Sequence, residues 1–377
     1  MVCEFKKEIE KNIAKMISII YPYRNRDLKR VERSFESLKN QSVQNFQIYF
    51  VDYGSEPEIK ECVRELCGAY SKIKYIHHAT RFQPWNKAKA LNSVVKKLET
   101  EICFVADIDM IFHPEFLKTA ISLQEPEKSV YFKVSFSESD DRLDGINPED
   151  FDQFRHSDHH ATGLTMFSVK ALKSINGFDE FYHLWGAEDT DVHVRLRNAG
   201  FKVEFYEKEI LMLHQWHESY RISEKIGLTA EFQIKKIVQL NHQHLKYAEE
   251  YGITRVNSDG WGKVMTAKQE SELLNCSIKM NLNDEKRTIE NLIYGVLSSQ
   301  SDGIFKVKIS ESENKEEFKN RLKKLAGKKI PEFYTMKEIN DLLLMHIISF
   351  YRDRPYIFQI SEDIKSITIA INFRSRV

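Results

Sequence analysis

The first third of the chain alternates short apolar runs with amphipathic stretches. Four apolar runs predict buried strands, at residues 16–21, 46–51, 73–77 and 102–106. Apolar side chains at helical spacing predict a helical lead and three helices between the strands, at residues 4–15, 27–39, 58–70 and 85–98. This alternation predicts an α/β fold: a doubly wound, mostly parallel mixed sheet with helices on both faces and ligand sites beyond the carboxyl ends of the strands.

The pattern changes toward the C-terminus. Residues 188–199 predict a further helix, which two short strands follow. Beyond about residue 257, lysine- and glutamate-rich helices dominate, and an apolar run at residues 366–373 predicts a final strand. Because domains commonly contain about 100–200 residues, we expect two of them. They are a catalytic domain at residues 1–255 and a small α/β accessory domain of unknown role at residues 256–377.

Charge and cysteine content exclude several classes of protein. The formal net charge is zero, which argues against a nucleic-acid-binding surface because neutralising phosphates requires a basic excess. The five cysteines are odd in number and lack metal-ligand spacing, so they indicate free thiols in a reducing, cytoplasmic compartment. No apolar run reaches the roughly 18 residues of a membrane span, so we expect any membrane contact to be peripheral.

Two carboxylates follow the strand predicted at residues 102–106. Asp107 and Asp109 are one residue apart, and on an extended backbone positions i and i+2 point to the same face. Carboxylates in this arrangement repel each other unless a cation lies between them, and hard divalent ions prefer oxygen ligands. The pair therefore predicts a site for Mn²⁺ or Mg²⁺, although a solvated turn after a strand has the same pattern.

A second acidic cluster opens the helix predicted at residues 188–199, directly after Trp185 and Gly186. Helix capping and the helix dipole explain one acid there, but Glu188 and Asp189 together exceed what a cap requires. A carboxylate at a ligand-facing helix start can act as general base for an acceptor hydroxyl. Trp185 offers a flat face for a sugar ring or, alternatively, packs in the core.

His214 and His217 flank a tryptophan at the end of a predicted strand. Histidines in such a place are candidate metal ligands or phosphate partners. We expect one of the two to bind the metal ion.

A loop-to-helix junction near residue 85 is rich in basic residues. Arg81, Asn86 and Lys87 suit a diphosphate there, because positive charge and exposed backbone N–H groups act together. A solvated basic helix face is the alternative.

Taken in chain order, five motifs resemble the family 2 glycosyltransferases and the galactosyltransferase-like C-terminal half of bacterial chondroitin polymerase. The motifs lie at residues 18–26, 51–55, 107–109, 176–180 and 185–191. The resemblance spans roughly residues 16–220 and implies a GT-A fold, that of nucleotide-diphospho-sugar transferases. The C-terminal segment resembles no family that we can name.

The resemblance also implies roles for residues around the donor. Pro22, Arg24 and Asp52 would line the nucleotide pocket, with Asp52 contacting the base or the ribose. Asp107 and Asp109 would hold the metal ion and the diphosphate. The implied donor is a UDP-sugar and the implied cofactor is Mn²⁺ or Mg²⁺.

The same resemblance implies the reaction. Asp189 resembles the catalytic base, Glu188 a contact to the donor or acceptor sugar, and His214 or His217 the histidine that completes metal coordination. The expected enzyme is an inverting glycosyltransferase that moves a hexose or N-acetylhexosamine from a UDP-sugar to a glycan acceptor. By analogy with the family, it would act in the synthesis of surface polysaccharide of the capsule or LPS type.

Two other functions are compatible with parts of this pattern. A nucleotidyltransferase shares the sheet and an acidic metal site, but it would need a glycine-rich phosphate loop where residues 21–26 read Tyr-Pro-Tyr-Arg-Asn-Arg. A catalytically silent carbohydrate-binding subunit could have kept the fold. Acids at every proposed position speak against it. Product analysis separates the two enzymes, and an assay of UDP-sugar hydrolysis or transfer with Mn²⁺ tests the silent subunit.

Overall fold

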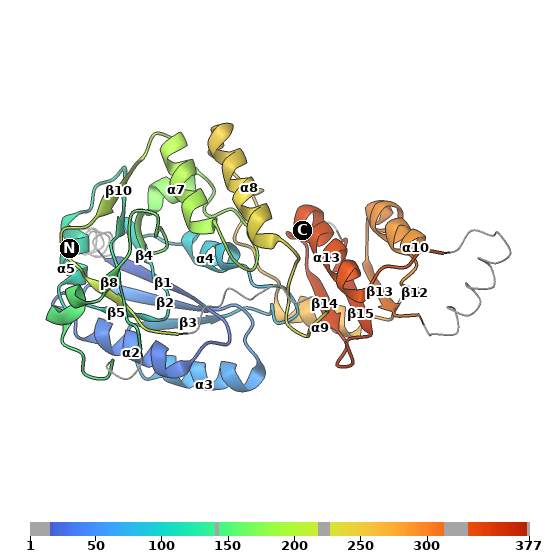
Figure 1. Ribbon diagram of the computed structural model, residues 1–377, viewed down its shortest axis with the longest axis horizontal. Coiled ribbons are helices and arrows are strands. Elements are labelled where there is room, and N and C mark those ends of the chain that lie inside the picture. The colour runs from blue at the N-terminus through green and yellow to red at the C-terminus, as the bar shows by residue number, and fades with distance from the viewer. Residues whose placement is uncertain (1–15, 140–142, 218–226, 313–330, 375–377) are drawn as a thin grey trace, which may run out of the picture. The chain divides into compact units, whose positions relative to one another are not determined.

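The computed structural model describes residues 16–139, 143–217, 227–312 and 331–374 (Figure 1). The helix predicted at residues 4–15 lies outside these ranges. The chain divides into two compact units. The first comprises Met1–His78, Asn86–Arg221 and Val238–Lys263, and the second comprises Ala79–Trp85, Ile222–Ile237 and Val264–Val377.

A seven-stranded sheet with the order β10-β6-β9-β4-β1-β2-β3 forms the centre of the first unit. Its strands are β1 (Ile17–Tyr23), β2 (Phe46–Asp52), β3 (Ile73–His77), β4 (Ile102–Val105), β6 (Lys128–Phe132), β9 (Thr165–Ser168) and β10 (Lys202–Tyr206). β1 is parallel to β2 and β4, whereas β9 is antiparallel to both β4 and β6. The predicted α/β fold with a mixed, parallel-rich sheet is therefore confirmed.

Helices cover both faces of this sheet, with α2 and α3 on one side and α4 and α7 on the other (Figure 1). The helices of this unit are α2 (Leu28–Lys39), α3 (Pro57–Gly68), α4 (Lys87–Val95), α5 (Phe116–Ser122), α6 (Val169–Ser174), α7 (Glu188–Asn198), α8 (Ile237–Glu250) and the 3₁₀ helix Pro148–Gln153. All residues of β1 are buried, which explains why its sequence is apolar except for Ser18. No helix of the described residues is long and apolar enough to cross a membrane.

The helix α4 is shorter than the predicted span of residues 85–98. The Asn86 side chain accepts a hydrogen bond from the Lys89 backbone N–H at 2.7 Å and so caps the helix. The helix therefore begins at Lys87, and this cap fixes the position of the Lys87 backbone, from which the side chain extends.

A second, four-stranded sheet of the first unit positions the candidate site. It has the order β5-β11-β7-β8, with β5 at Met110–Phe112, β11 at Met212–His214, β7 at Ser135–Phe136 and β8 at Arg155–His156. The antiparallel β5–β11 pair continues in a hydrogen bond of 2.8 Å from the Gln215 N–H to the Asp109 carbonyl oxygen, which brings Asp109 beside His214.

The chain turns between β4 and β5, at Ile108 and Asp109. The expectation that Asp107 and Asp109 share one face of an extended strand is therefore wrong. Because of the turn, the two carboxylates have different neighbours.

The second unit is built on the sheet β12-β13-β15-β14. Its strands are β12 (Met280–Asn283), β13 (Ile304–Ser310), β14 (Tyr356–Ile360) and β15 (Ser366–Asn372). Its helices are α9 (Ala267–Asn275), α10 (Lys286–Asn291), α11 (Leu297–Ser299), α13 (Met336–His346) and the π-helices Leu292–Val296 and Ile347–Tyr351. Ala79–Trp85 joins this unit, since the Phe358 N–H donates to the Phe82 carbonyl at 2.9 Å, although the sequence predicts this segment inside the first domain.

Gly177 is a position where an added methyl group is expected to destabilise the fold. Its φ is +72°, and a Cβ there would lie 2.8 Å from Cζ3 of Trp261 and closer still to Asn92 Oδ1. Asn92 cannot easily move, because its side chain bonds both the N–H and the carbonyl of Phe178 at 2.9 and 2.8 Å.

We expect Gly177→Ala to lower the free energy of unfolding by about 2–4 kcal/mol, combining a left-handed backbone with overpacking. Gly145→Ala is the matched control, because Gly145 has a φ of +74° and nothing within 4 Å of the added Cβ. That variant should lose roughly 1 kcal/mol. Urea unfolding measures both, and equal losses would exclude the steric contribution.

Candidate active site

The turn before α7 presents two acids at the start of the helix. Leu184, Gly186 and Ala187 have φ values of 63°, 109° and 70°, so three of four consecutive residues are left-handed. Such backbone strain persists where the surrounding structure imposes it and is common at functional sites. Glu188 and Asp189 are the first two residues of α7, and no side chain caps the helix. Side-chain capping therefore does not explain this acidic cluster, whereas the helix dipole favours acids in this first turn.

Lys87 lies among three carboxylates that come from different parts of the chain. Its Nζ is 2.9 Å from Asp189 Oδ2, 3.4 Å from Asp107 Oδ1 and 3.9 Å from Glu188 Oε1. Although burial lowers the pKa of Lys87, the three acids together raise it well above the usual value. The structure thus brings together four residues that the sequence singled out in three separate motifs.

Asp189 is suited to accept a proton near neutral pH. Burial raises its pKa to about 7; the Lys87 charge opposes this shift, while Glu188 and Asp107 add to it. A carboxylate with a pKa near the working pH is an effective general base.

Gly163 is a residue of this site that the sequence did not single out. A Cβ at this position would lie 3.3 Å from Asp189 Oδ2 and 3.7 Å from Asp107 Oδ2. The neighbouring Thr162 hydroxyl is 3.0 Å from the Thr190 hydroxyl on α7. The loop before β9 therefore runs close against both acids, and a lone glycine in a polar loop gave no signal of this.

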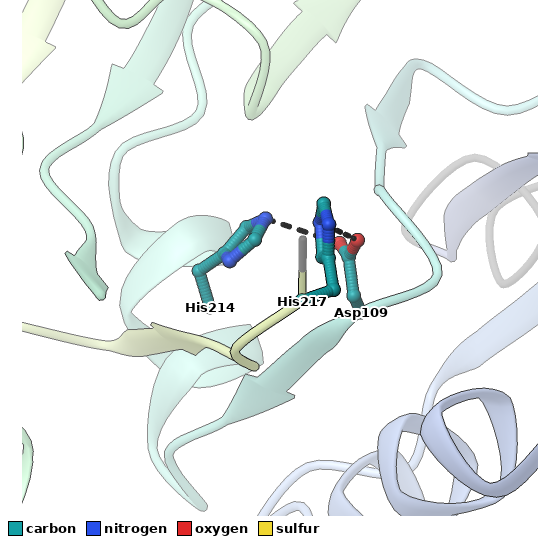
Figure 2. A group of neighbouring side chains, drawn as sticks. All are labelled: Asp109, His214 and His217. Atoms are coloured by element: carbon teal, nitrogen blue, oxygen red, sulfur yellow. Dashed lines mark ion pairs between the residues drawn. The ribbon is translucent and has the colours of Figure 1, made fainter. Parts of the chain in front are cut away.

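Asp109, His214 and His217 form a candidate metal centre (Figure 2). Asp109 Oδ2 is 3.1 Å from His217 Nε2, Asp109 Oδ1 is 3.6 Å from His214 Nε2, and one ligand atom from each residue lies within 4.8 Å of the others. Although burial alone would raise it, the two histidines lower the pKa of Asp109, which keeps the carboxylate ionised.

The residues of this centre fit a divalent ion. Asp109 Oδ1 is buried and accepts no hydrogen bond from any described residue. An orphaned carboxylate oxygen facing imidazole nitrogens is a donor set that a transition-metal ion satisfies. Asp107 is outside this group of three, so its role as a metal ligand stays a prediction, whereas both histidines, rather than one, face Asp109.

His217→Ala is expected to weaken Mn²⁺ binding at least tenfold, because it removes one of three protein ligands. Electron paramagnetic resonance of free Mn²⁺ during titration measures the affinity. His156→Ala is the control, since the His156 ring bonds the Asp152 carbonyl at 3.1 Å outside the centre. Unchanged Mn²⁺ affinity in His217→Ala would exclude His217 as a ligand.

The residues predicted to line the nucleotide pocket lie at the carboxyl ends of β1 and β2. Pro22 pairs with Val51, and Tyr23 with Asp52, so Pro22, Arg24 and Asp52 meet at one edge of the sheet. The Asp52 carboxylate is buried and accepts hydrogen bonds from the Ser55 N–H at 2.8 Å and the Tyr75 hydroxyl at 2.7 Å. These bonds organise the loop after β2.

Contacts of these residues with a nucleotide stay predictions. Arg81 belongs to the second unit, and its contact with the diphosphate stays a prediction as well. Trp185 is 41% exposed, so the alternative that it packs in the core is wrong.

A buried ionic network supports the helix that carries Asp189. The Arg195 guanidinium bonds Asp191 Oδ2 at 2.6 Å and the Gly177 carbonyl at 2.9 Å, with both charged side chains fully buried. Asp179 accepts a hydrogen bond at 2.9 Å from His244 on α8. The motif at residues 176–180 therefore links α7 to α8.

Comparisons with known proteins agree with the motifs. The family profile described as glycosyl transferase family 2 matches residues 18–176, and the profile described as the N-terminal domain of galactosyltransferase matches residues 146–225. Human chondroitin sulfate synthase 3 is 28% identical over 118 residues, covering 29% of this chain and 13% of the relative. Mouse chondroitin sulfate N-acetylgalactosaminyltransferase 2 is 23% identical over 262 residues, covering 64% of this chain and 47% of the relative.

The chain therefore spans less than half the length of these curated relatives. Among solved structures, GalNAc-T7 with UDP, GalNAc and Mn²⁺ aligns at a TM-score of 0.45 and 12% identity, covering 62% of this chain and 48% of the other. A mannosyltransferase from Pyrobaculum calidifontis with GDP-Man and Mn²⁺ aligns at a TM-score of 0.39 and 18% identity, covering 54% of this chain and 57% of the other. The chain is therefore similar to the family 2 glycosyltransferases over residues 18–176 and to the N-terminal domain of galactosyltransferase over residues 146–225.

Proposed function

We propose that this chain is a metal-dependent, inverting glycosyltransferase, and that it moves a hexose or N-acetylhexosamine from a UDP-sugar to a glycan acceptor. One observation carries the proposal: the site contains two separate acidic centres. Asp109 faces His214 and His217, while Asp189 is paired with Lys87. The first centre suits an ion that binds the diphosphate, and the second leaves a carboxylate to act on the acceptor.

The ligand atoms of the candidate metal centre favour Mn²⁺ over Mg²⁺. Mg²⁺ prefers oxygen ligands in an octahedral arrangement, whereas two of the three side chains here offer imidazole nitrogen. Asp109, His214 and His217 would hold the ion and leave further positions for the diphosphate oxygens of the donor. When bound, the ion supplies positive charge that stabilises the leaving UDP.

The residues of the second centre support a single displacement. Asp189 takes the proton of the acceptor hydroxyl while that oxygen bonds to the anomeric carbon and the bond to the diphosphate breaks. One such step inverts the anomeric configuration. Lys87 orients the Asp189 carboxylate through their 2.9 Å hydrogen bond, and Gly163 leaves the space beside it without a side chain.

The names of the relatives narrow the choice of substrates to test. One relative is an N-acetylgalactosaminyltransferase and another a chondroitin sulfate synthase, so we propose UDP-N-acetylhexosamine as a donor and a polysaccharide chain as acceptor. We infer that the product is a surface polysaccharide.

A donor panel tests the proposal. Purified full-length chain is incubated with each UDP-sugar and a polysaccharide acceptor, with Mn²⁺, Mg²⁺ or a chelator, and released UDP and pyrophosphate are measured. We expect UDP release with Mn²⁺, less with Mg²⁺ and none with the chelator. Release of pyrophosphate would indicate nucleotidyl transfer, and absence of turnover with every donor would leave a silent binding subunit.

A further inference from the structure

Helix α8 lies beside α7, and the two helices run in the same direction (Figure 1). Near their N-terminal ends, the Asn241 side chain donates to the Trp185 carbonyl at 3.0 Å. Near their C-terminal ends, the Asn198 side chain donates to the Ala248 carbonyl at 3.1 Å. Helix α8 therefore begins at the turn that presents Glu188 and Asp189, and it leads away from the catalytic acids.

A row of rings follows one face of α8. Phe181 packs on His244 with ring centroids 4.3 Å apart, His244 stacks with Tyr247 at 6.3 Å, and Tyr247 contacts Tyr251 at 4.9 Å. The spacing of three residues places His244 and Tyr247 on the same side of the helix. Tyr251 directly follows the helix, and its N–H donates to the Tyr247 carbonyl at 3.1 Å, which continues the same side. We call these four residues the α8 ladder.

The outer rings of the ladder are exposed, although folding normally buries aromatic side chains. Tyr247 is 50% exposed and Tyr251 is 70% exposed. At the inner end, the bond from His244 to Asp179 fixes the orientation of the ring on which Tyr247 stacks. The result is a fixed series of flat apolar faces in solvent.

Polar side chains lie next to these faces. Gln243, Lys246 and Glu250 are exposed on the same helix. A sugar ring has an apolar face of C–H groups and a rim of hydroxyls, so it can stack on an aromatic ring while its hydroxyls bond to neighbouring amide, ammonium and carboxylate groups. A surface on which rings alternate with hydrogen-bonding groups therefore fits a glycan partner better than it fits an apolar protein partner.

We propose that the α8 ladder binds the acceptor glycan several sugar units away from the end that receives the new sugar. This inference rests on the proposed function, because it assigns the body of the acceptor to one face of α8, the helix whose Asn241 bonds the turn before Glu188. The ladder is too small for a second copy of the chain. A specific protein interface buries about 800 Å² on each partner, whereas two half-exposed or mostly exposed tyrosines offer well below that area.

The experiment compares a short and a long acceptor of the same polysaccharide with the full chain and Mn²⁺. We expect the double variant Tyr247→Ala/Tyr251→Ala to raise the KM for the long acceptor about tenfold. Its kcat with the long acceptor and both constants with the short acceptor should stay as in the wild type. Tyr294→Ala is the matched control, because Tyr294 is also 70% exposed but lies in the second unit outside the ladder.

An unchanged KM for the long acceptor, or an equal change for both acceptors, would overturn the proposal. So would light scattering that shows a wild-type dimer and a monomeric double variant. Failure of the proposed function is a different result, since the wild type would then transfer no sugar even to the short acceptor. In that case, titration of the chain with the long glycan alone still tests the ladder, and equal affinity of the wild type and the double variant would exclude it.

Discussion

Asp189→Asn is expected to lower kcat for sugar transfer by about 10²–10⁴-fold, the range that a general base contributes. The amide has nearly the same size as the carboxylate, and its oxygen can still accept the 2.9 Å hydrogen bond from Lys87. It cannot take a proton from the acceptor. Because Asp189 is not among the three residues of the metal centre, UDP-sugar binding in the presence of Mn²⁺ should persist.

Steady-state transfer and calorimetric titration with UDP-sugar measure these two properties separately. Asp144→Asn is the control, since Asp144 is an exposed carboxylate whose cationic partners are Lys29 and Arg33 rather than Lys87. It should transfer sugar like the wild type. Near-normal turnover in Asp189→Asn would remove Asp189 from the role of base, and loss of donor binding would assign it a binding role instead.

The pH profile of the wild type provides a second readout of the same residue. Burial raises the pKa of Asp189 to about 7, and only the ionised carboxylate accepts a proton. The rate of transfer should therefore rise as the pH increases through about 7 and then level off. The residual activity of Asp189→Asn should lack this rise.

Two central strands of the first sheet, β1 and β4, could be predicted because they are buried on both faces, whereas β6 and β9 are equally buried but mix apolar residues with lysine, serine or threonine. Apart from Ser18, the sequences of β1 and β4 are apolar and therefore easily recognised. In the second unit, β12 and β13 mix apolar residues with asparagine or lysine, so no continuous apolar run marks them. Lys306, for example, is buried within β13 because its ammonium donates to the Leu274 carbonyl at 2.7 Å, a contact that no local pattern reveals.

The site could be predicted by residue type but not by arrangement. The sequence predicts the acids at residues 107–109 and 188–189 and the histidines at residues 214 and 217, because these residue types at strand or helix ends indicate metal and proton chemistry. Their partners depend on contacts between distant segments: Lys87 is 102 residues from Asp189 along the chain. The turn after β4 separates Asp107 from Asp109, and it depends on the pairing of β5 with β11 about a hundred residues later.

Arg195→Met is expected to destabilise the protein by about 3–5 kcal/mol, because it leaves the Asp191 carboxylate buried without its cation. The melting temperature should fall by on the order of 10 °C. Arg64→Met is the matched control: it breaks an exposed ion pair with Glu61 and should cost no more than about 1 kcal/mol. Chemical unfolding and calorimetry compare the two losses, and similar losses would mean that the buried pair contributes no more than a surface pair.

The pH dependence distinguishes an uncompensated charge from lost packing. Burial already raises the pKa of Asp191, and Arg195 opposes that shift, so Arg195→Met should raise the pKa further. A carboxyl whose folded pKa exceeds its unfolded value destabilises the fold above the unfolded pKa of about 4 and has no such effect below it. The stability loss should therefore shrink as the pH falls toward about 4, and Asp191→Asn/Arg195→Met should recover part of it at neutral pH. A loss that is independent of pH would point to packing alone.

Because α7 carries Asp189 at one end and Arg195 within it, we also expect transfer activity to decline together with stability in Arg195→Met.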